Sequence, residues 1–218
     1  MAFSSISAFA GITYFDFGST ADPGGAIFSD IDGVIWTNRG PLGTYLVDET
    51  EFQNSIQILR RLVEKTQSRN VVFITNHTAV ARNLKAFDEF EYRVRELFGN
   101  ISQILPNVLY LACLHHPAAQ NEHLRVACDC RKPKPGLITF ATNYLNIDFS
   151  NSIIIGDKIS DIALASQVCI SNSYLVFNEE SFTGLNVEAE EIYLSKLAGI
   201  NFTAVRSLQQ LVEKEIKF

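Results

Sequence analysis

Unbroken apolar runs alternate with amphipathic segments along most of the chain. The apolar runs are short and contain no alternating polar residues, which is typical of strands buried on both faces. They cover residues 26–29, 71–76, 108–112, 152–156 and 173–177. Apolar residues at helical spacing predict helices over residues 50–66, about 79–97, 135–145, 162–168 and 205–216. Strands of this kind separated by helices favour an α/β fold, with a parallel sheet covered by helices on both faces.

Polar residues stand where three of these predicted strands end. There is a pair after the first strand, a pair at the end of the second and a single acid after the fourth: Asp30, Asp32, Thr75, Asn76 and Asp157. Ligands of open α/β sheets bind at the carboxyl ends of the strands. We therefore expect these side chains to form one site.

The pair Asp30 and Asp32 suits phosphoryl transfer, because one carboxylate can attack phosphorus while the other protonates the leaving oxygen. Taken alone, the sequence Asp-x-Asp-Gly is equally typical of a turn. Asp157 would add a third carboxylate around Mg²⁺, an ion that prefers oxygen ligands. We expect Asp161 to be an acid at a helix start, stabilised by the helix dipole, rather than a metal ligand.

Two further segments offer contacts to phosphate oxygens. Thr75 and Asn76 present a hydroxyl group and backbone N–H groups just before a predicted helix. Arg131 and Lys132 lie in a basic run that precedes another predicted helix. Each segment alone has an ordinary structural explanation, as a turn or as a solvated basic run. Their order, between the strand of Asp30 and that of Asp157, is the order that a phosphotransferase forming an aspartyl phosphate requires.

Composition narrows the class of protein. The chain has 218 residues, of which 47% are hydrophobic, as expected for one domain with a buried core. It has no uninterrupted apolar stretch of about 18 residues, which a membrane span needs. The net charge of −6 makes a nucleic acid an unfavourable partner. Residues 1–25 lack the basic start of a secretory signal, so we expect an N-terminal extension on a cytoplasmic protein, with the main domain over residues 26–218.

Three of the four cysteines gather in one segment. Cys113, His115, Cys128 and Cys130 form the pattern C-x-H-x₁₂-C-x-C, a closed set of three thiolates and one imidazole that is typical of structural zinc. A disulfide framework would instead spread its cysteines through a small secreted chain. Cys169 lies in an apolar run, and we expect it to be buried in the core.

The order of these motifs resembles that of the haloacid dehalogenase (HAD) superfamily of phosphatases, from about residue 26 to the C-terminal helix. The resemblance implies a Rossmann-like HAD fold with a zinc-binding loop over residues 113–130. Residues 33–74 are used by a loop, a helix and a strand, so we expect no large cap domain there.

The same resemblance implies a role for each motif residue. Asp30 would be the nucleophile, and Asp32 would be the general acid and base. Thr75 and Lys132 would hold the transferring phosphoryl group. Asp30, the backbone carbonyl of Asp32 and Asp157 would hold Mg²⁺.

Within the superfamily, the cysteine segment and the run over residues 131–136 are similar to the family of D-glycero-D-manno-heptose-1,7-bisphosphate 7-phosphatases. This resemblance implies Mg²⁺-dependent hydrolysis of the sugar 7-phosphate, in the biosynthesis of nucleotide-activated heptose for lipopolysaccharide or capsule. It also implies substrate contacts, which are assigned to Asn38, Arg39, Gly40, Pro41, Asn76, His77, Thr78 and Arg131. The expected partner is a small phosphorylated sugar rather than a nucleic acid or a membrane, and the oligomeric state stays open.

Three other functions remain as alternatives. The histidinol-phosphate phosphatases share the zinc ligands and the CDCRKPK run. Polynucleotide 3′-phosphatases share the motif order. A non-catalytic HAD-like interaction module would need to have lost a motif acid or the lysine, and none is missing. The chain also departs from the heptose family, because His77 and Thr78 stand where that family has Gln and Ser, and residues 177–180 stand where Arg-Thr-Gly is usual.

Overall fold

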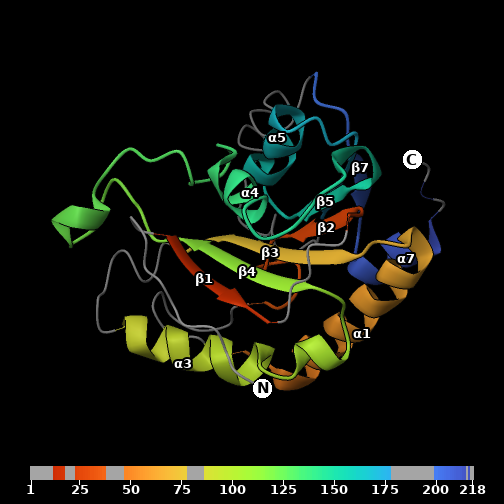
Figure 1. Ribbon diagram of the computed structural model, residues 1–218, viewed down its shortest axis with the longest axis horizontal. Helices are drawn as coiled ribbons and strands as arrows, with labels where there is room; N and C mark the ends of the chain where they lie inside the picture. Colours follow the sequence, from red (N-terminus) through yellow and green to blue (C-terminus); the bar gives the residue numbers. More distant parts are fainter. Residues whose placement is uncertain are drawn as a thin grey trace, which may run out of the picture.

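The computed structural model describes residues 12–17, 23–37, 47–77, 86–177, 199–214 and 216, and of residues 86–90 only the backbone. Within these residues, seven strands form one sheet in the order β1-β4-β3-β2-β5-β6-β7 (Figure 1). The strands are β1 (Ile12–Asp16), β2 (Ala26–Ser29), β3 (Asn70–Asn76), β4 (Val108–Cys113), β5 (Ile153–Gly156), β6 (Asn172–Val176) and β7 (Thr203–Val205).

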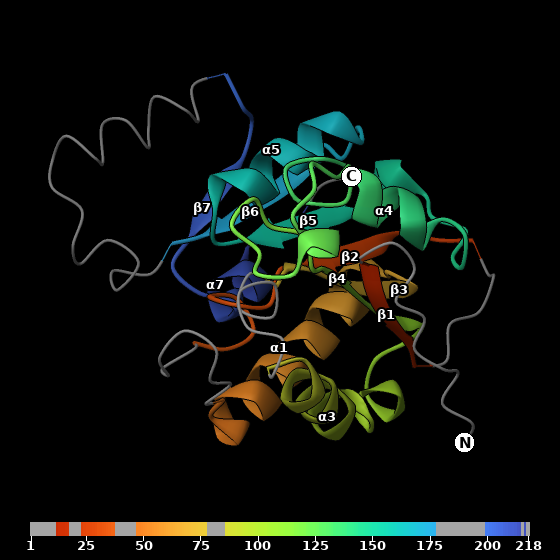
Figure 2. The same ribbon diagram turned by 90° about the vertical axis from the view of Figure 1, so that its left-hand side faces the viewer.

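Helices cover both faces of the sheet (Figure 2). On one face lie α1 (Glu49–Thr66), α3 (Ala86–Phe98) and α7 (Leu208–Glu213), and on the other lie α4 (Gly136–Ala141) and α5 (Ile159–Gln167). Short 3-10 helices cover Ile101–Gln103, Glu122–Leu124 and Phe149–Asn151. Each face of the sheet has its own hydrophobic cluster, and successive residues of β2 alternate between them: Ile27 packs in the cluster of α1, and Phe28 in that of α4. The predicted α/β fold, with helices on both faces, is confirmed.

All five predicted strands are present, and two further strands were not predicted. The first, β1, lies within the expected N-terminal extension and pairs with β4 in antiparallel orientation, whereas the other strand pairs are parallel. Only every second residue of β1 is buried, as is usual for an edge strand, so it lacks the unbroken apolar run that marked the others. The second, β7, has three residues, two of them exposed, and is too short to show a pattern.

Four helices differ from their predicted bounds. α3 is described from Ala86, and its predicted start at about residue 79 lies outside the described residues. α4 ends at Ala141 rather than residue 145, because the amide groups of Asn143 and Tyr144 bond three residues back and form tight turns. α5 begins at Ile159 rather than residue 162, because the Asp161 carboxylate accepts the N–H of Lys158 and caps the helix start. α7 begins at Leu208 rather than residue 205, because β7 ends at Val205 and the Ser207 side chain caps the helix start.

Two other features bear on the expectations from the sequence. Cys169 lies two residues after the end of α5, at a backbone φ of 58°, and is exposed, so the prediction that it is buried in the core was wrong. The described part of the chain contains no cap domain, and α1 is the helix that it shows between β2 and β3. Among the described helices, none combines the length and the apolar character that crossing a membrane would require.

Candidate active site

The polar strand ends meet at one edge of the sheet, because β3, β2 and β5 are parallel neighbours. A cavity of about 270 Å³ opens there. Its lining consists of Asp30, Asp32, Thr75, Asn76, Arg131, Lys132, Lys158 and Ser160. The structure therefore brings together the acids after β2, the end of β3 and the basic run over residues 131–132, as expected for strands whose carboxyl ends share an edge.

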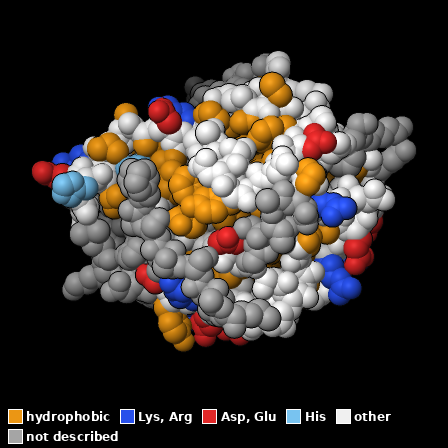
Figure 3. All heavy atoms as spheres, viewed as in Figure 1, with side chains coloured by type: hydrophobic (Ala, Val, Ile, Leu, Met, Phe, Trp, Pro, Cys, Tyr) orange, Lys and Arg blue, Asp and Glu red, His pale blue; other side chains and the backbone are white. Residues whose placement is uncertain are grey.

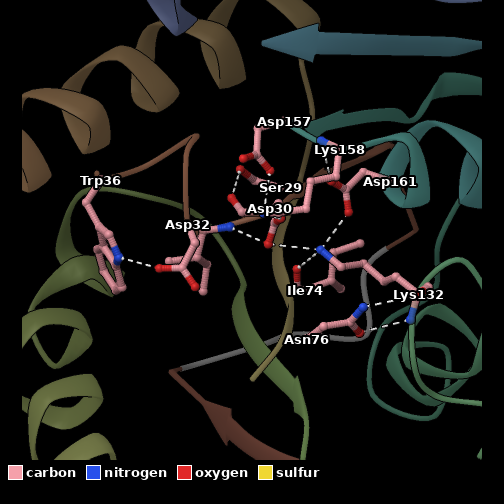
Figure 4. Close-up of polar contacts among 11 residues, drawn as sticks. Ser29, Asp30, Asp32, Trp36, Ile74, Asn76, Lys132, Asp157, Lys158 and Asp161 are labelled. Atoms are coloured by element: carbon pink, nitrogen blue, oxygen red, sulfur yellow. Dashed lines mark hydrogen bonds and ion pairs between the residues drawn. The ribbon is translucent and has the colours of Figure 1, made fainter. Parts of the chain in front are cut away.

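Asp30 is the buried acid at the centre of this site (Figure 4). Its amide donates to the Ile155 carbonyl at 2.8 Å, which extends the β2–β5 ladder, and its Oδ1 accepts the Ile31 N–H at 2.8 Å. Burial raises the pKa of Asp30, but the positive charges of Lys132 and Lys158 outweigh burial and lower the pKa below its usual value. Asp30 is therefore held as a carboxylate.

Lys132 is buried and forms ion pairs with two acids (Figure 4). Its Nζ lies 2.9 Å from Asp30 Oδ1 and 2.7 Å from Asp161 Oδ1, and it donates to the Ile74 carbonyl at 2.9 Å. Burial lowers the pKa of Lys132, but the charges of Asp161 and Asp30 raise it more, so the side chain stays protonated.

Asp32 is held in a tight turn that ends at Trp36. Gly33 has a φ of 85°, and its N–H donates to the Trp36 carbonyl at 2.8 Å. A Cβ at Gly33 would lie 2.2 Å from Asp157 Oδ2, so only glycine fits. The buried Trp36 donates from Nε1 to Asp32 Oδ1 at 2.9 Å (Figure 4). Burial, and then the negative charge of Asp30, raise the pKa of Asp32, which favours the protonated form that a general acid needs.

Three acids form a group that could hold a cation: ligand oxygens of Asp30, Asp157 and Asp161 all lie within 4.8 Å of one another. Burial and the charge of Asp30 raise the pKa of Asp157 to about 7. Lys158 Nζ lies 2.9 Å from Asp157 Oδ1 and 3.8 Å from Asp30 Oδ2, and these negative charges raise the pKa of Lys158 although burial opposes them.

Asp161 has a larger role than the sequence predicted. It does cap the helix start, since its Oδ2 accepts the N–H of Lys158 at 3.1 Å. It is also fully buried and ion-paired with Lys132, and burial raises its pKa despite that pair. Gly156 makes this approach possible, because a Cβ there would lie 2.1 Å from Asp161 Cβ. The signal in the sequence was its position four residues after Asp157, in the first turn of the helix that begins at this strand end.

The residues expected to contact substrate lie in different places. Arg131 and Asn76 line the cavity, and both Asn76 amide atoms bond the main chain of Lys132. His77 is buried and does not belong to the cavity lining. Its backbone N–H donates to the Cys113 carbonyl at 2.8 Å. Burial lowers the pKa of His77 to about 3, although the charge of Asp30 opposes this, so the ring is neutral. The expected contacts at residues 38–41 and Thr78 lie outside the described residues.

The four predicted zinc ligands form one cluster. Cys113 Sγ lies 3.7 Å from His115 Nδ1, 3.7 Å from Cys128 Sγ and 3.1 Å from Cys130 Sγ, and His115 Nδ1 lies 3.2 Å from Cys130 Sγ. Zn–S bonds of about 2.3 Å in a tetrahedron put sulfur atoms about 3.8 Å apart, close to the larger of these separations. Hydrogen bonding from Cys130 lowers the pKa of the Cys113 thiol to about 6, although burial opposes this shift. The donor set fits a tetrahedral metal ion.

This cluster is linked to the end of β3 through His77 and to the cavity lining through Arg131. His77 follows the end of β3 and bonds the carbonyl of Cys113. Arg131, which directly follows Cys130, donates from Nη1 to the His115 carbonyl at 3.0 Å. A metal ion held by the cluster would therefore fix the backbone just before Lys132.

Comparisons with known proteins agree with this geometry. The family model described as polynucleotide kinase 3 phosphatase matches residues 27–180. The chain is also 31% identical over 179 residues to D-glycero-beta-D-manno-heptose-1,7-bisphosphate 7-phosphatase of Escherichia coli O6:H1, which covers 80% of this chain and 91% of that one. The chain belongs to the family of heptose-1,7-bisphosphate 7-phosphatases, within the HAD superfamily. The resemblance read from its motifs is confirmed.

Two solved structures share the fold of this HAD phosphatase. A Mesorhizobium loti protein described as HAD-like matches with a TM-score of 0.59 and 24% identity, covering 78% of this chain and 81% of that one. The D,D-heptose 1,7-bisphosphate phosphatase of B. bronchiseptica, solved with magnesium and phosphate, matches with a TM-score of 0.57 and 19% identity, covering 87% and 96%. At these identities the two structures support the HAD fold of the chain.

Proposed function

We propose that this protein is a Mg²⁺-dependent phosphatase that removes the 7-phosphate of D-glycero-D-manno-heptose 1,7-bisphosphate. The observation that carries the proposal is a buried, ionised Asp30 beside an Asp32 of raised pKa, in a cavity that also presents basic side chains. The substrate follows from the relatives, since the Escherichia coli enzyme of this name covers 80% of the chain at 31% identity.

In the first step, a carboxylate oxygen of Asp30 attacks the phosphorus atom in line with the leaving sugar oxygen. The new bond joins Asp30 to phosphorus, and the bond between phosphorus and the sugar oxygen breaks. Asp32 gives its proton to that oxygen, and its raised pKa keeps the proton available. Lys132 and Thr75 stabilise the negative charge on the phosphoryl oxygens during the transfer.

In the second step, water releases the phosphate from Asp30. Asp32, now ionised, takes a proton from the water as its oxygen bonds to phosphorus, and the bond from phosphorus to Asp30 breaks. Trp36 keeps Asp32 aimed during both steps, because its indole N–H holds Asp32 Oδ1 and leaves Oδ2 for proton transfer. Asp30 returns to the carboxylate form that its basic neighbours favour.

The acids of the site fit a magnesium ion, which prefers oxygen ligands. We assign the ion to Asp30, Asp157 and the backbone carbonyl of Asp32, because Asp161 is engaged with Lys132 and the start of α5. When bound, the ion neutralises negative charge on the phosphoryl oxygens beside Asp30. The side chain of Lys158 is 57% exposed, so it can leave its contact with Asp157 as a cation enters.

We assign the second metal site, at Cys113, His115, Cys128 and Cys130, to structural zinc. Three thiolates and one imidazole fill all four tetrahedral positions, so no position is left for water, and this metal takes no part in bond breaking. Its role is to fix the loop that precedes Arg131 and Lys132, and so to aim both cations at the substrate.

Two alternative substrates are tested beside the sugar. Histidinol phosphate is one, because that branch shares the cysteine segment. A 3′-phosphorylated polynucleotide is the other, in view of the family model's description. The net charge of −6 disfavours the polynucleotide. On the face in Figure 3, Lys and Arg side chains of the described residues lie near acidic ones rather than in a stripe.

The deciding experiment measures phosphate release from D-glycero-D-manno-heptose 1,7-bisphosphate, histidinol phosphate and a 3′-phosphorylated oligonucleotide at saturating Mg²⁺. We expect the highest kcat/KM for the heptose bisphosphate, and phosphorus NMR should show loss of the 7-phosphate with the 1-phosphate retained. Asp30→Asn, purified in parallel, controls for a contaminating phosphatase. Faster turnover of histidinol phosphate or of the oligonucleotide would assign the protein to that substrate instead.

A further inference from the structure

The side-chain amide of Asn76 holds the main chain of Lys132 at two points (Figure 4). Asn76 Oδ1 accepts the Lys132 N–H at 2.9 Å, and Asn76 Nδ2 donates to the Lys132 carbonyl at 3.1 Å. The two bonds define the orientation of the amide, because its oxygen accepts and its nitrogen donates. They attach Lys132 to the end of β3 much as a neighbouring strand would be attached.

Lys132 needs such an attachment because no helix or strand holds it. It lies in the turns between the Cys/His cluster and α4, which begins at Gly136. A lysine side chain is a flexible four-carbon stem, so its ammonium group is placed accurately only if its main chain is fixed. The end of β3 holds both the side chain and the backbone of Lys132. The Ile74 carbonyl accepts a hydrogen bond from Nζ at 2.9 Å, and Asn76 holds the backbone.

We infer that Asn76 is a positioning residue: its side chain sets the Lys132 ammonium beside Asp30 and does not itself bind the substrate. The resemblance to the heptose phosphatases had assigned Asn76 to substrate contacts. The inference rests on the proposed function, in which Lys132 stabilises the transferring phosphoryl group. It adds that phosphate affinity and rate depend on Asn76 only through Lys132.

A double-mutant cycle tests this dependence. The readout is kcat/KM for p-nitrophenyl phosphate at saturating Mg²⁺, which does not depend on the identity of the sugar. Asn76→Ala should lower kcat/KM by about 100-fold, the size of effect that a misplacement of about 1 Å produces. In a Lys132→Met background, the same change should alter kcat/KM by no more than about twofold, which is the scatter of independent effects.

Asn70→Ala is the matched control. Asn70 is at the opposite end of β3, is buried, and donates from Nδ2 to the carbonyls of Gly24 at 3.2 Å and Gly25 at 3.4 Å. Its loss should lower Tm and leave kcat/KM unchanged, which separates a general loss of stability from a loss of positioning. Hydrogen exchange gives a direct second measurement, because the Lys132 N–H should exchange faster in Asn76→Ala and at the parent rate in Asn70→Ala.

The outcomes separate this inference from the proposed function. Additive losses in the double variant would show that Asn76 contacts substrate itself, and would overturn the inference, as would full activity of Asn76→Ala. A parent protein inactive toward every phosphate ester overturns the proposed function and the inference with it. If Asn76→Ala does not fold, Asn76→Asp carries the same cycle, because it keeps an oxygen for the Lys132 N–H and has no donor for the Lys132 carbonyl.

Discussion

Replacement of Lys132 by methionine should destabilise the folded protein strongly and in a pH-dependent way. The Lys132 ammonium is buried between two buried carboxylates, at 2.9 Å from Asp30 and 2.7 Å from Asp161. Methionine has a similar length but no charge, so the change removes the ammonium while filling most of its space. Two negative charges are then left close together without their shared partner.

The magnitude follows from the cost of an uncompensated buried charge. Removal of one partner of a buried ion pair costs roughly 3–5 kcal/mol of the free energy of unfolding. For a domain of this size, each 1 kcal/mol lowers Tm by about 2–4 °C, so the shift should be roughly 6–20 °C. Lys158, the other nearby cation, lies 3.8 Å from Asp30 Oδ2 with a side chain 57% exposed, and it compensates only in part.

The pH dependence follows from the two acids. Burial raises the pKa of both Asp30 and Asp161, and the charge of Lys132 lowers both. Without Lys132, both folded pKa values should lie above the unfolded value of 3.8. A carboxyl with a raised folded pKa loses stability as the pH rises through that pKa. The loss in Lys132→Met should therefore be largest near neutral pH and shrink as the pH falls toward about 4.

Urea unfolding, followed by fluorescence of Trp36, the single tryptophan, measures this loss. Parent and variant are compared at about pH 7.5 and about pH 5 without added Mg²⁺. Lys134→Met is the control, because Lys134 pairs with Asp129 at 3.1 Å with both side chains at least 51% exposed, and such pairs contribute about 1 kcal/mol or less. A Lys132→Met loss no greater than that of the control, or one independent of pH, would refute the reasoning.

Three further changes test the assigned roles. Asp30→Asn should fold normally and lose at least about 10³ in kcat, or about 4 kcal/mol of transition-state stabilisation, and activity within about tenfold of the parent would exclude Asp30 as the nucleophile. Asp157→Asn should raise the Mg²⁺ concentration for half-maximal activity because a charged ligand is lost, whereas an unchanged requirement would remove Asp157 from the ion site. Cys128→Ser should fold, contain less than the parent's one zinc per chain by mass spectrometry, and have a raised KM, while a zinc-free parent of full activity would contradict a zinc site.

The sequence alone determined the inner strands of the sheet and the polar strand ends that meet at the site. A strand buried on both faces must be apolar throughout, so β2, β3, β4, β5 and β6 were visible as unbroken runs. Acids placed directly after such strands must meet, because parallel strands end at a common edge. The cysteine segment was equally plain, since two close pairs of thiolate and imidazole ligands have few explanations other than a metal.

Only the tertiary structure decided how these residues are paired. β1 is half-buried and is recognisable as a strand through its pairing with β4, almost a hundred residues further along. The partnership of Lys132 with Asp161 depends on Gly156, which lets the first turn of α5 approach β5. The Asn76 amide meets a backbone 56 residues away. Local patterns report burial and backbone preference, whereas these contacts depend on which loops the sheet order places side by side.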